Sequence, residues 1–160
     1  MTTHLNKKNK PTIVNIIEKK NTIRYALAEG KVKFSEKVFK KLIDLKTKKG
    51  EITSIAIIAG ILGAKKTSEL IPLCHNINLE NINIDIRTNI KTKSFTVLAE
   101  AKTYGKTGVE MEALTAVTIS CLTIYDMCKS LDKSILITDI KLLVKKGGKS
   151  DFKQNKNIKD

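Results

Sequence analysis

TYGKTGVEMEALTAVTISCLTIYDMCK, residues 103–129, is the stretch that decides the fold. Thr107 and Glu110 form the Thr-x-x-Glu pattern of a capping box, which predicts that a helix starts near Gly108. Apolar side chains then recur at steps of three and four residues, which is typical of an amphipathic helix with a broad apolar face. They are Leu114, Val117, Cys121, Ile124, Tyr125 and Cys128. We therefore expect one long helix that packs on the core.

Charged side chains stand at both ends of this helix. Glu110 and Glu112 lie in its first turn, near the positive end of the helix dipole, and Asp126 and Lys129 share a face of its last turns. The simpler interpretation makes Glu110 a cap and pairs Asp126 with Lys129 on the surface. Glu112 and Asp126, however, are 14 residues apart, which is about 21 Å along a helix axis. If both act on one small reacting centre, a second copy of the helix supplies one of them, and the active site is shared between subunits.

Length and composition indicate one globular domain. The chain has 160 residues, and 41% of them are hydrophobic, enough to bury a sizeable core. Residues 1–10 lack the apolar segment of a signal peptide, and the longest apolar stretch, Ile55–Ala64, is too short to span a bilayer. Cys74, Cys121 and Cys128 form an odd set, with two of them in one helix. This favours reduced thiols and a cytoplasmic location over a disulfide framework.

The net charge of +14 at pH 7 suggests two classes of partner. A nucleic-acid-binding domain is one, but the lysines are scattered over the whole chain and only seven aromatic side chains could stack on bases. A general bias toward Lys, Asn and Ile explains the charge more simply. A polyanionic substrate, such as a derivative of a nucleoside triphosphate, is the other class that such a surface attracts.

Periodicity along the chain predicts the order strand, helices, two strands, helix, strand. The predicted strands are 12–17 at a sheet edge, 22–34 with a bulge at Gly30, 82–86, 95–101 and 134–144. The other predicted helices are 36–46 and 52–70, the second of them buried over its first part and separated from the first by a basic loop at 46–50. This order is that of an α+β, ferredoxin-like fold, an antiparallel sheet with helices packed on one face. We divide the chain into a flexible arm (1–10), a single domain (11–152) and a charged tail (153–160).

Two Gly-Lys-[Ser/Thr] triplets invite a nucleotide-binding interpretation, Gly105-Lys106-Thr107 and Gly148-Lys149-Ser150. A P-loop needs a further glycine five residues upstream, and Glu100 and Leu143 stand there instead. Neither triplet is therefore predicted to be a Walker motif. His75 beside Cys74 does not make a metal site either, because the sequence offers no second cluster of ligands. A structural or exposed loop histidine is the simpler interpretation.

Four longer motifs occur in order, KTSELIPLCH (66–75), TGVEMEALTA (107–116), TIYDMCK (123–129) and GGKS (147–150). Together they resemble the MoaC family of molybdenum cofactor biosynthesis, and the resemblance covers residues 13–152. It implies a lyase that converts the 3′,8-cyclised form of GTP to cyclic pyranopterin monophosphate and releases pyrophosphate. A radical S-adenosylmethionine GTP cyclase would supply the substrate. The resemblance also implies a ferredoxin-like homo-hexamer, a trimer of dimers with the site at the dimer interface, and neither nucleic acid nor membrane as a partner.

The resemblance carries site residues onto matching positions. It implies Asp126, Lys129 and Lys49 as catalytic residues, with Asp126 and Lys129 as an acid/base pair in which the cation tunes the carboxylate. The implied substrate-binding residues are Leu73, Cys74, His75, Met111, Glu112, Lys145, Arg24 and Lys19. Lys49, Lys145 and Arg24 would hold the triphosphate and stabilise charge on the departing pyrophosphate. Glu112 and the backbone of Met111 would meet the donor edge of the base, and His75 would assist in binding or proton transfer. No resident cofactor and no protein-bound metal are expected, and a divalent cation that accompanies the pyrophosphate stays open as an alternative.

The sequence departs from the usual family pattern at three positions. Asn15 stands where aspartate is usual, Asn76 replaces the proline after the Leu-Cys-His motif, and Asp151 replaces a glycine after GGKS. None of them belongs to the presumed acid/base pair, so a lyase is the leading interpretation. A basic nucleic-acid-binding domain and a catalytically weakened homologue are the alternatives.

Overall fold

The computed structural model describes residues 4–6, 8–44 and 46–154, and for 44 and 46–50 it describes the backbone alone. Within this range the elements form one five-stranded sheet in the order β2-β3-β1-β4-β5, in which all neighbours are antiparallel. The strands are β1 (Thr22–Lys33), β2 (Asn81–Asn89), β3 (Ser94–Gly105), β4 (Leu136–Lys146) and β5 (Phe152–Lys153). The helices are α1 (Glu36–Asp44), α2 (Lys46–Lys65), α3 (Thr67–Leu70) and α4 (Glu110–Cys128).

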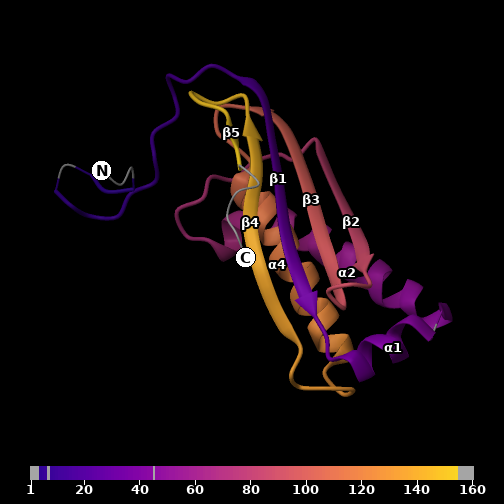
Figure 1. Ribbon diagram of the computed structural model, residues 1–160. Coiled ribbons are helices and arrows are strands. Elements are labelled where there is room, and N and C mark those ends of the chain that lie inside the picture. Colours follow the sequence, from indigo (N-terminus) through magenta and orange to yellow (C-terminus); the bar gives the residue numbers. More distant parts are fainter. Residues whose placement is uncertain (1–3, 7, 45, 155–160) are drawn as a thin grey trace.

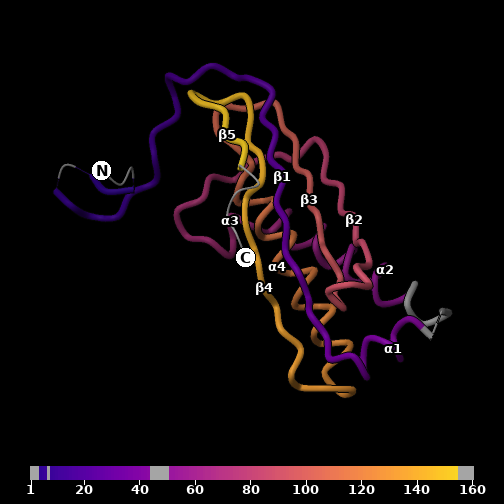
Figure 2. The backbone as a smooth tube through the Cα atoms, in the orientation of Figure 1, coloured from indigo at the N-terminus to yellow at the C-terminus, as the bar shows by residue number. Residues whose placement is uncertain are grey.

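The helices cover one face of the sheet, with α4 against β1 and its neighbours and α2 beside α4 (Figure 1). The predicted α+β, ferredoxin-like fold with an antiparallel sheet is therefore confirmed. Because β1 lies between β3 and β4 and runs antiparallel to both, its beginning lies next to their ends. Figure 2 shows these three chain segments meeting at one end of the molecule.

Buried and more exposed side chains alternate along β1 and along most of β3. Ala99 and Ala101 of β3 and Ala26 and Ala28 of β1 are fully buried, and the side chains between them face away from the helices. On one face of a sheet such small side chains let a helix approach closely. The paired half-buried strand predicted at 82–86 is also present as β2, in which Ile84 is buried.

The bulge predicted at Gly30 serves the packing of α4. The register between β1 and β4 shifts between Glu29 and Lys31. A Cβ atom at Gly30 would lie only 2.5 Å from the Cγ1 atom of Val117 and 3.1 Å from the sulfur of Cys121. The missing side chain thus makes room for the apolar face of α4, and a larger residue there would push the helix off the sheet.

Several predicted boundaries are wrong. Residues 12–17 form no strand, and the predicted basic loop at 46–50 belongs to α2, which begins at Lys46. The predicted helix 52–70 is interrupted at Lys66, after which α3 forms a single turn. The short strand β5 was not predicted; it pairs with the end of β4.

The helix predicted to be buried is only half buried. Ala56 of α2 is inaccessible and its carbonyl accepts a 2.9 Å hydrogen bond from the hydroxyl of Ser120 in α4. Ile55, Ile58 and Leu62, in contrast, are 46%, 60% and 53% exposed. The apolar residues all round α2 therefore form two faces in this protomer. One face packs on the core, and the other is an apolar face on the surface.

The length and composition of α4 would suit a membrane span, but so would those of any long core helix. Its side chains Val117, Cys121 and Ile124 are fully buried against the sheet and α2. The predicted amphipathic core helix is confirmed.

Candidate functional site

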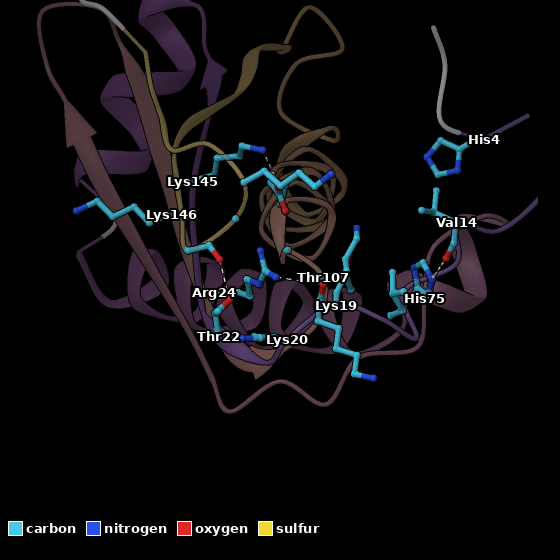
Figure 3. A pocket seen from close by; sticks show the side chains of 17 residues that line it. His4, Val14, Lys19, Lys20, Thr22, Arg24, His75, Thr107, Lys145 and Lys146 are labelled. Carbon is cyan, nitrogen blue, oxygen red and sulfur yellow. Dashed lines mark hydrogen bonds and ion pairs between the residues drawn. The ribbon is translucent and has the colours of Figure 1, made fainter.

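A pocket of about 590 Å³ lies where β1 begins and β3 and β4 end. Its walls come from the segment before β1, the first residues of β1, the loop between β3 and α4, the first residue of α4, and the glycine turn after β4, together with His75 (Figure 3). These segments are distant in sequence and meet only because of the strand order.

The pocket lining is strongly cationic. Among the described residues it contains a single carboxylate, that of Glu110, and two imidazoles, those of His4 and His75. Its cationic side chains are Lys19, Lys20, Arg24, Lys106, Lys145, Lys146 and Lys149. A concave surface with this excess of positive charge concentrates polyanions such as phosphate chains.

Arg24 forms part of the pocket wall and is 9% exposed. Its Nε atom donates to the carbonyl of Gly105 and its Nη2 atom to the carbonyl of Lys106, each at 3.1 Å. The remaining Nη1 atom lies toward Gly148, 3.2 Å from where a Cβ of that residue would be. The guanidinium therefore fixes the loop that leads into α4 and leaves only part of its donor set for a ligand.

The glycine turn after β4 is held from two sides. Gly147 has a φ of +84°, and a Cβ atom there would overlap the carbonyl oxygen of Ile23. Its amide donates to the carboxylate of Asp151 at 3.0 Å, and its carbonyl accepts a 2.7 Å hydrogen bond from the hydroxyl of Thr22. The unusual Asp151 thus has a structural role in the turn that carries Lys149.

Glu110 does not cap its helix. The N-cap residue of α4 is Val109, with no side-chain cap hydrogen bond, and the helix begins two residues after the predicted Gly108. The Glu110 carboxylate lies instead 3.4 Å from the ammonium of Lys145. Lys145 points across the pocket, whereas the next residue, Lys146, points to the other side of the strand (Figure 3).

Two hydrogen bonds tie the segment before β1 to the pocket. The Nε2 atom of His75 lies 2.7 Å from the carbonyl oxygen of Val14, and the ammonium of Lys106 donates to the carbonyl of Ile17 at 2.7 Å. The unusual Asn15 accepts a hydrogen bond from the amide of Ile17 at 2.9 Å. His75 is therefore a half-buried residue of the pocket wall, and not merely an exposed loop residue.

Glu112 is the one buried acidic side chain among the described residues, 3% exposed. Its Oε2 atom has no hydrogen-bond partner within the described part of the chain. Burial, and secondarily repulsion by Glu110, raises the pKa of Glu112 to about 7, although a backbone hydrogen bond opposes the shift. Burial, together with the charge of Glu112, also raises the pKa of the Cys74 thiol. Glu112 and Cys74 thus form a low-dielectric region beside the cationic pocket.

Asp126 and Lys129 lie at the other end of α4. Their side chains form an ion pair of 2.6 Å and are 67% and 58% exposed, as the surface interpretation predicts. They do not line the pocket of their own protomer. Of the other predicted residues, Met111 is 37% exposed, Leu73 is partly buried in its loop, and the side chain of Lys49 lies outside the described residues.

The structure thus brings Lys19, Arg24, His75 and Lys145 together. Sequence reasoning missed Lys20, Lys106, Lys146, Lys149 and the pocket role of Glu110. The signal for two of them was present, because Lys106 and Lys149 are the central residues of the two Gly-Lys-[Ser/Thr] triplets. Neither triplet is a P-loop, yet both meet at this pocket since β3 and β4 flank β1.

Comparison with known proteins identifies relatives of the whole domain. The model of the MoaC family matches residues 13–148. A protein of Helicobacter hepaticus is 54% identical over 151 residues, which cover 94% of this chain and 95% of the relative. A Helicobacter pylori protein is 51% identical over 92% of this chain and 94% of its own length, and one from Clostridium acetobutylicum is 44% identical over 95% of both. All three are named cyclic pyranopterin monophosphate synthase.

Proposed function

The chain belongs to the MoaC family, and from that premise we propose that it is a lyase of molybdenum cofactor biosynthesis. It converts the 3′,8-cyclised form of GTP to cyclic pyranopterin monophosphate and releases pyrophosphate. The observation that carries this proposal is the identity of 44–54% with synthases of that name over at least 92% of the chain. The cationic pocket supports it, because the substrate carries a triphosphate.

Turnover of the cyclised GTP tests this function. The purified protein should release pyrophosphate and form a pterin in equal amounts, and a rate near that of the Helicobacter relatives would exclude a weakened homologue. Folded protein that releases neither product would overturn the proposal. Steeply salt-dependent binding of nucleic acid in place of turnover would support the binding-domain alternative.

The pocket holds the triphosphate in this proposal. Lys19, Lys145 and the free part of the Arg24 guanidinium bind its oxygens and stabilise the charge that develops on the leaving pyrophosphate. Lys106 and Lys149 join them from the two loops that face each other. Charge-assisted hydrogen bonds of this kind are shorter and stronger than neutral ones, so several of them position the reacting phosphate firmly.

The base of the substrate lies toward Glu112. A buried carboxylate oxygen without a partner costs free energy, and a ligand that donates hydrogen bonds removes this cost. The donor edge of a guanine-derived ring fits that need, with the backbone of Met111 and the loop of Leu73, Cys74 and His75 beside it. The pocket and Glu112 thus divide the substrate into a phosphate end and a base end.

The acid/base pair comes from a second copy of the chain. Asp126 and Lys129 are exposed, and Asp126 lies 14 residues from Glu112 on the same rigid helix, or about 21 Å away. A two-fold axis that sets two α4 helices antiparallel would bring this pair to the base end of the partner's site. Lys49, in the first turn of α2, is assigned to the triphosphate and to the charge on the departing pyrophosphate. A fully active monomer, detected by sedimentation under assay conditions, would contradict the shared site.

The assembly and cellular context follow from the same proposal. The enzyme is a homo-hexamer, a trimer of dimers, in the cytoplasm, and it receives its substrate from a radical S-adenosylmethionine GTP cyclase. The exposed apolar face of α2 supports assembly, because apolar patches on a protomer mark contact surfaces. Within the described residues no three His, Cys, Asp or Glu side chains form a group suited to a metal ion. We assign proton transfer to the protein's own side chains and place any divalent cation on the phosphates of the substrate.

A further inference from the structure

Glu110 is out of place among the residues of the pocket. It is the single carboxylate in the described lining, which contains seven cationic residues; of these, Lys146 points its side chain to the other side of the strand. One of its oxygens lies 3.4 Å from the ammonium of Lys145, and the two side chains are 29% and 33% exposed. A half-buried ion pair of this kind is screened less than a fully exposed pair.

Neither capping nor packing accounts for this position. The N-cap residue of α4 is Val109, not Glu110, and the Glu110 carboxylate lies against the ammonium of Lys145. Gly108 lets the carboxylate fold back over the loop, because a Cβ atom at Gly108 would overlap its Oε2 atom. The local sequence therefore makes room for a negative charge at the rim of a cationic pocket.

We propose that Glu110 is a positioning residue that holds Lys145 in the free enzyme and releases it to a phosphate oxygen when substrate binds. This inference rests on the proposed phosphate-binding role of the pocket. When pyrophosphate leaves, the Glu110 carboxylate takes the ammonium back. Glu110 thereby limits how tightly the pocket retains its polyanionic product.

The physical reason is competition for one cation. Without a counter-charge, the cationic side chains that face the pocket would repel each other and would bind pyrophosphate tightly, which slows its release. A carboxylate at 3.4 Å neutralises Lys145 in the free state. Binding of phosphate must then break this ion pair, so the ion pair lowers the affinity of the pocket for pyrophosphate. After pyrophosphate leaves, the same ion pair holds Lys145 in position for the next turnover.

The experiment measures pyrophosphate and inorganic tripolyphosphate binding by calorimetry, with the full-length protein. Glu110→Gln keeps the shape and removes the charge, and it should bind pyrophosphate roughly three- to tenfold more tightly than the unmodified protein. KM for the cyclised GTP should fall, and kcat should fall with it because pyrophosphate leaves slowly. Glu80→Gln is the matched control, since it removes an exposed carboxylate outside the pocket lining and should change neither constant.

Each outcome separates this inference from the proposed function. Equal or weaker pyrophosphate binding by a folded Glu110→Gln variant overturns the positioning role but leaves the lyase intact. If the unmodified protein turns over substrate without binding pyrophosphate, the phosphate assignment of the pocket and this inference fail together. If Glu110→Gln does not fold, Glu110→Asp keeps the charge but shortens its reach. It should still bind pyrophosphate about twofold more tightly, and unchanged binding would overturn the positioning role.

Discussion

The two ends of α4 place carboxylates in opposite surroundings. At the start, Glu112 is 3% exposed and Glu110 faces the cationic pocket. At the end, Asp126 and Lys129 form an ion pair on an open surface. Exposed ion pairs contribute little to stability, so the far end of the helix has no structural need for its charges within one protomer. In the proposed function, the start of α4 therefore belongs to the site of its own protomer, and the end of α4 belongs to the site of a partner chain.

The largest expected effect separates the two ends. Asp126→Ala and Lys129→Ala should lower kcat roughly 100- to 10,000-fold, as expected for loss of general acid–base catalysis. The melting temperature should stay unchanged because the pair is exposed. Asp85→Ala is the control, since it breaks another exposed 2.6 Å ion pair, that with Arg87, outside the pocket lining. Steady-state kinetics measures kcat, and calorimetry measures the melting temperature. Near-normal turnover of Asp126→Ala would contradict the catalytic role of Asp126.

The buried carboxyl at the start of α4 should make the free energy of unfolding depend on pH. The pKa of Glu112 rises from 4.5 to about 7 on folding, so the folded protein binds the proton more tightly than the unfolded chain. Stability from this group is therefore complete below pH 4.5 and is lost as the pH rises through 7. Glu112→Gln should gain stability over the unmodified protein between pH 5 and 8, by up to about 3 kcal/mol.

Urea unfolding at pH 5 and at pH 8 measures the stability that Glu112→Gln gains. Glu100→Gln is a control of opposite sign, because a hydrogen bond from Lys102 is the main cause that lowers the pKa of Glu100. Its loss of stability should be greater at pH 8 than near pH 3. A Glu112→Gln gain that does not change with pH would mean that the carboxyl titrates normally in the folded protein.

Removal of a phosphate-binding cation should have an intermediate effect. Lys145→Ala should lower kcat/KM roughly 10- to 100-fold, mainly through KM, since a hydrogen bond from a charged group is lost. Lys141→Ala is the matched control on the same strand, where the lysine pairs with Glu29 at 3.7 Å outside the pocket. Equal effects of the two substitutions would show that general charge and not the pocket attracts the substrate.

The smallest expected effect concerns the glycine turn. Asp151→Ala removes the acceptor of the Gly147 amide in an exposed position. The amide can turn to water instead, so KM should rise only about twofold and stability should fall by less than about 1 kcal/mol. A large loss of turnover in this variant would indicate that Asp151 meets the substrate directly.

Sequence predicted the sheet well because alternation is a local signal. Ile84, Val97 and Ala99 face the core where the period of two places them. The capping box was wrong because Lys145, 35 residues further along, recruits the carboxylate of Glu110. Residues 12–17 have a strand-like composition but no strand to pair with. Local pattern carries no information on such distant partners.

The candidate site shows the same limit. Family motifs pointed to His75, Arg24 and Lys145, all of which line the pocket. The convergence of Lys106 and Lys149 depends on strand order, which no single motif encodes. The proposed relation between Glu112 and Asp126 depends on a second copy of the chain, and a reaction that requires both copies tests it.

Mixed assemblies of two variants, each strongly impaired at substrate concentrations well below the KM of the unmodified protein, test this claim most directly. Lys145→Ala damages the pocket and Asp126→Ala the acid/base pair, and the two chains are co-expressed with different tags. With a shared site, half of the dimers are mixed and one of two sites in each is intact, so roughly a quarter of the unmodified activity should return. Activity no greater than the average of the two separate variants, in assemblies shown to contain both chains, would contradict the shared site.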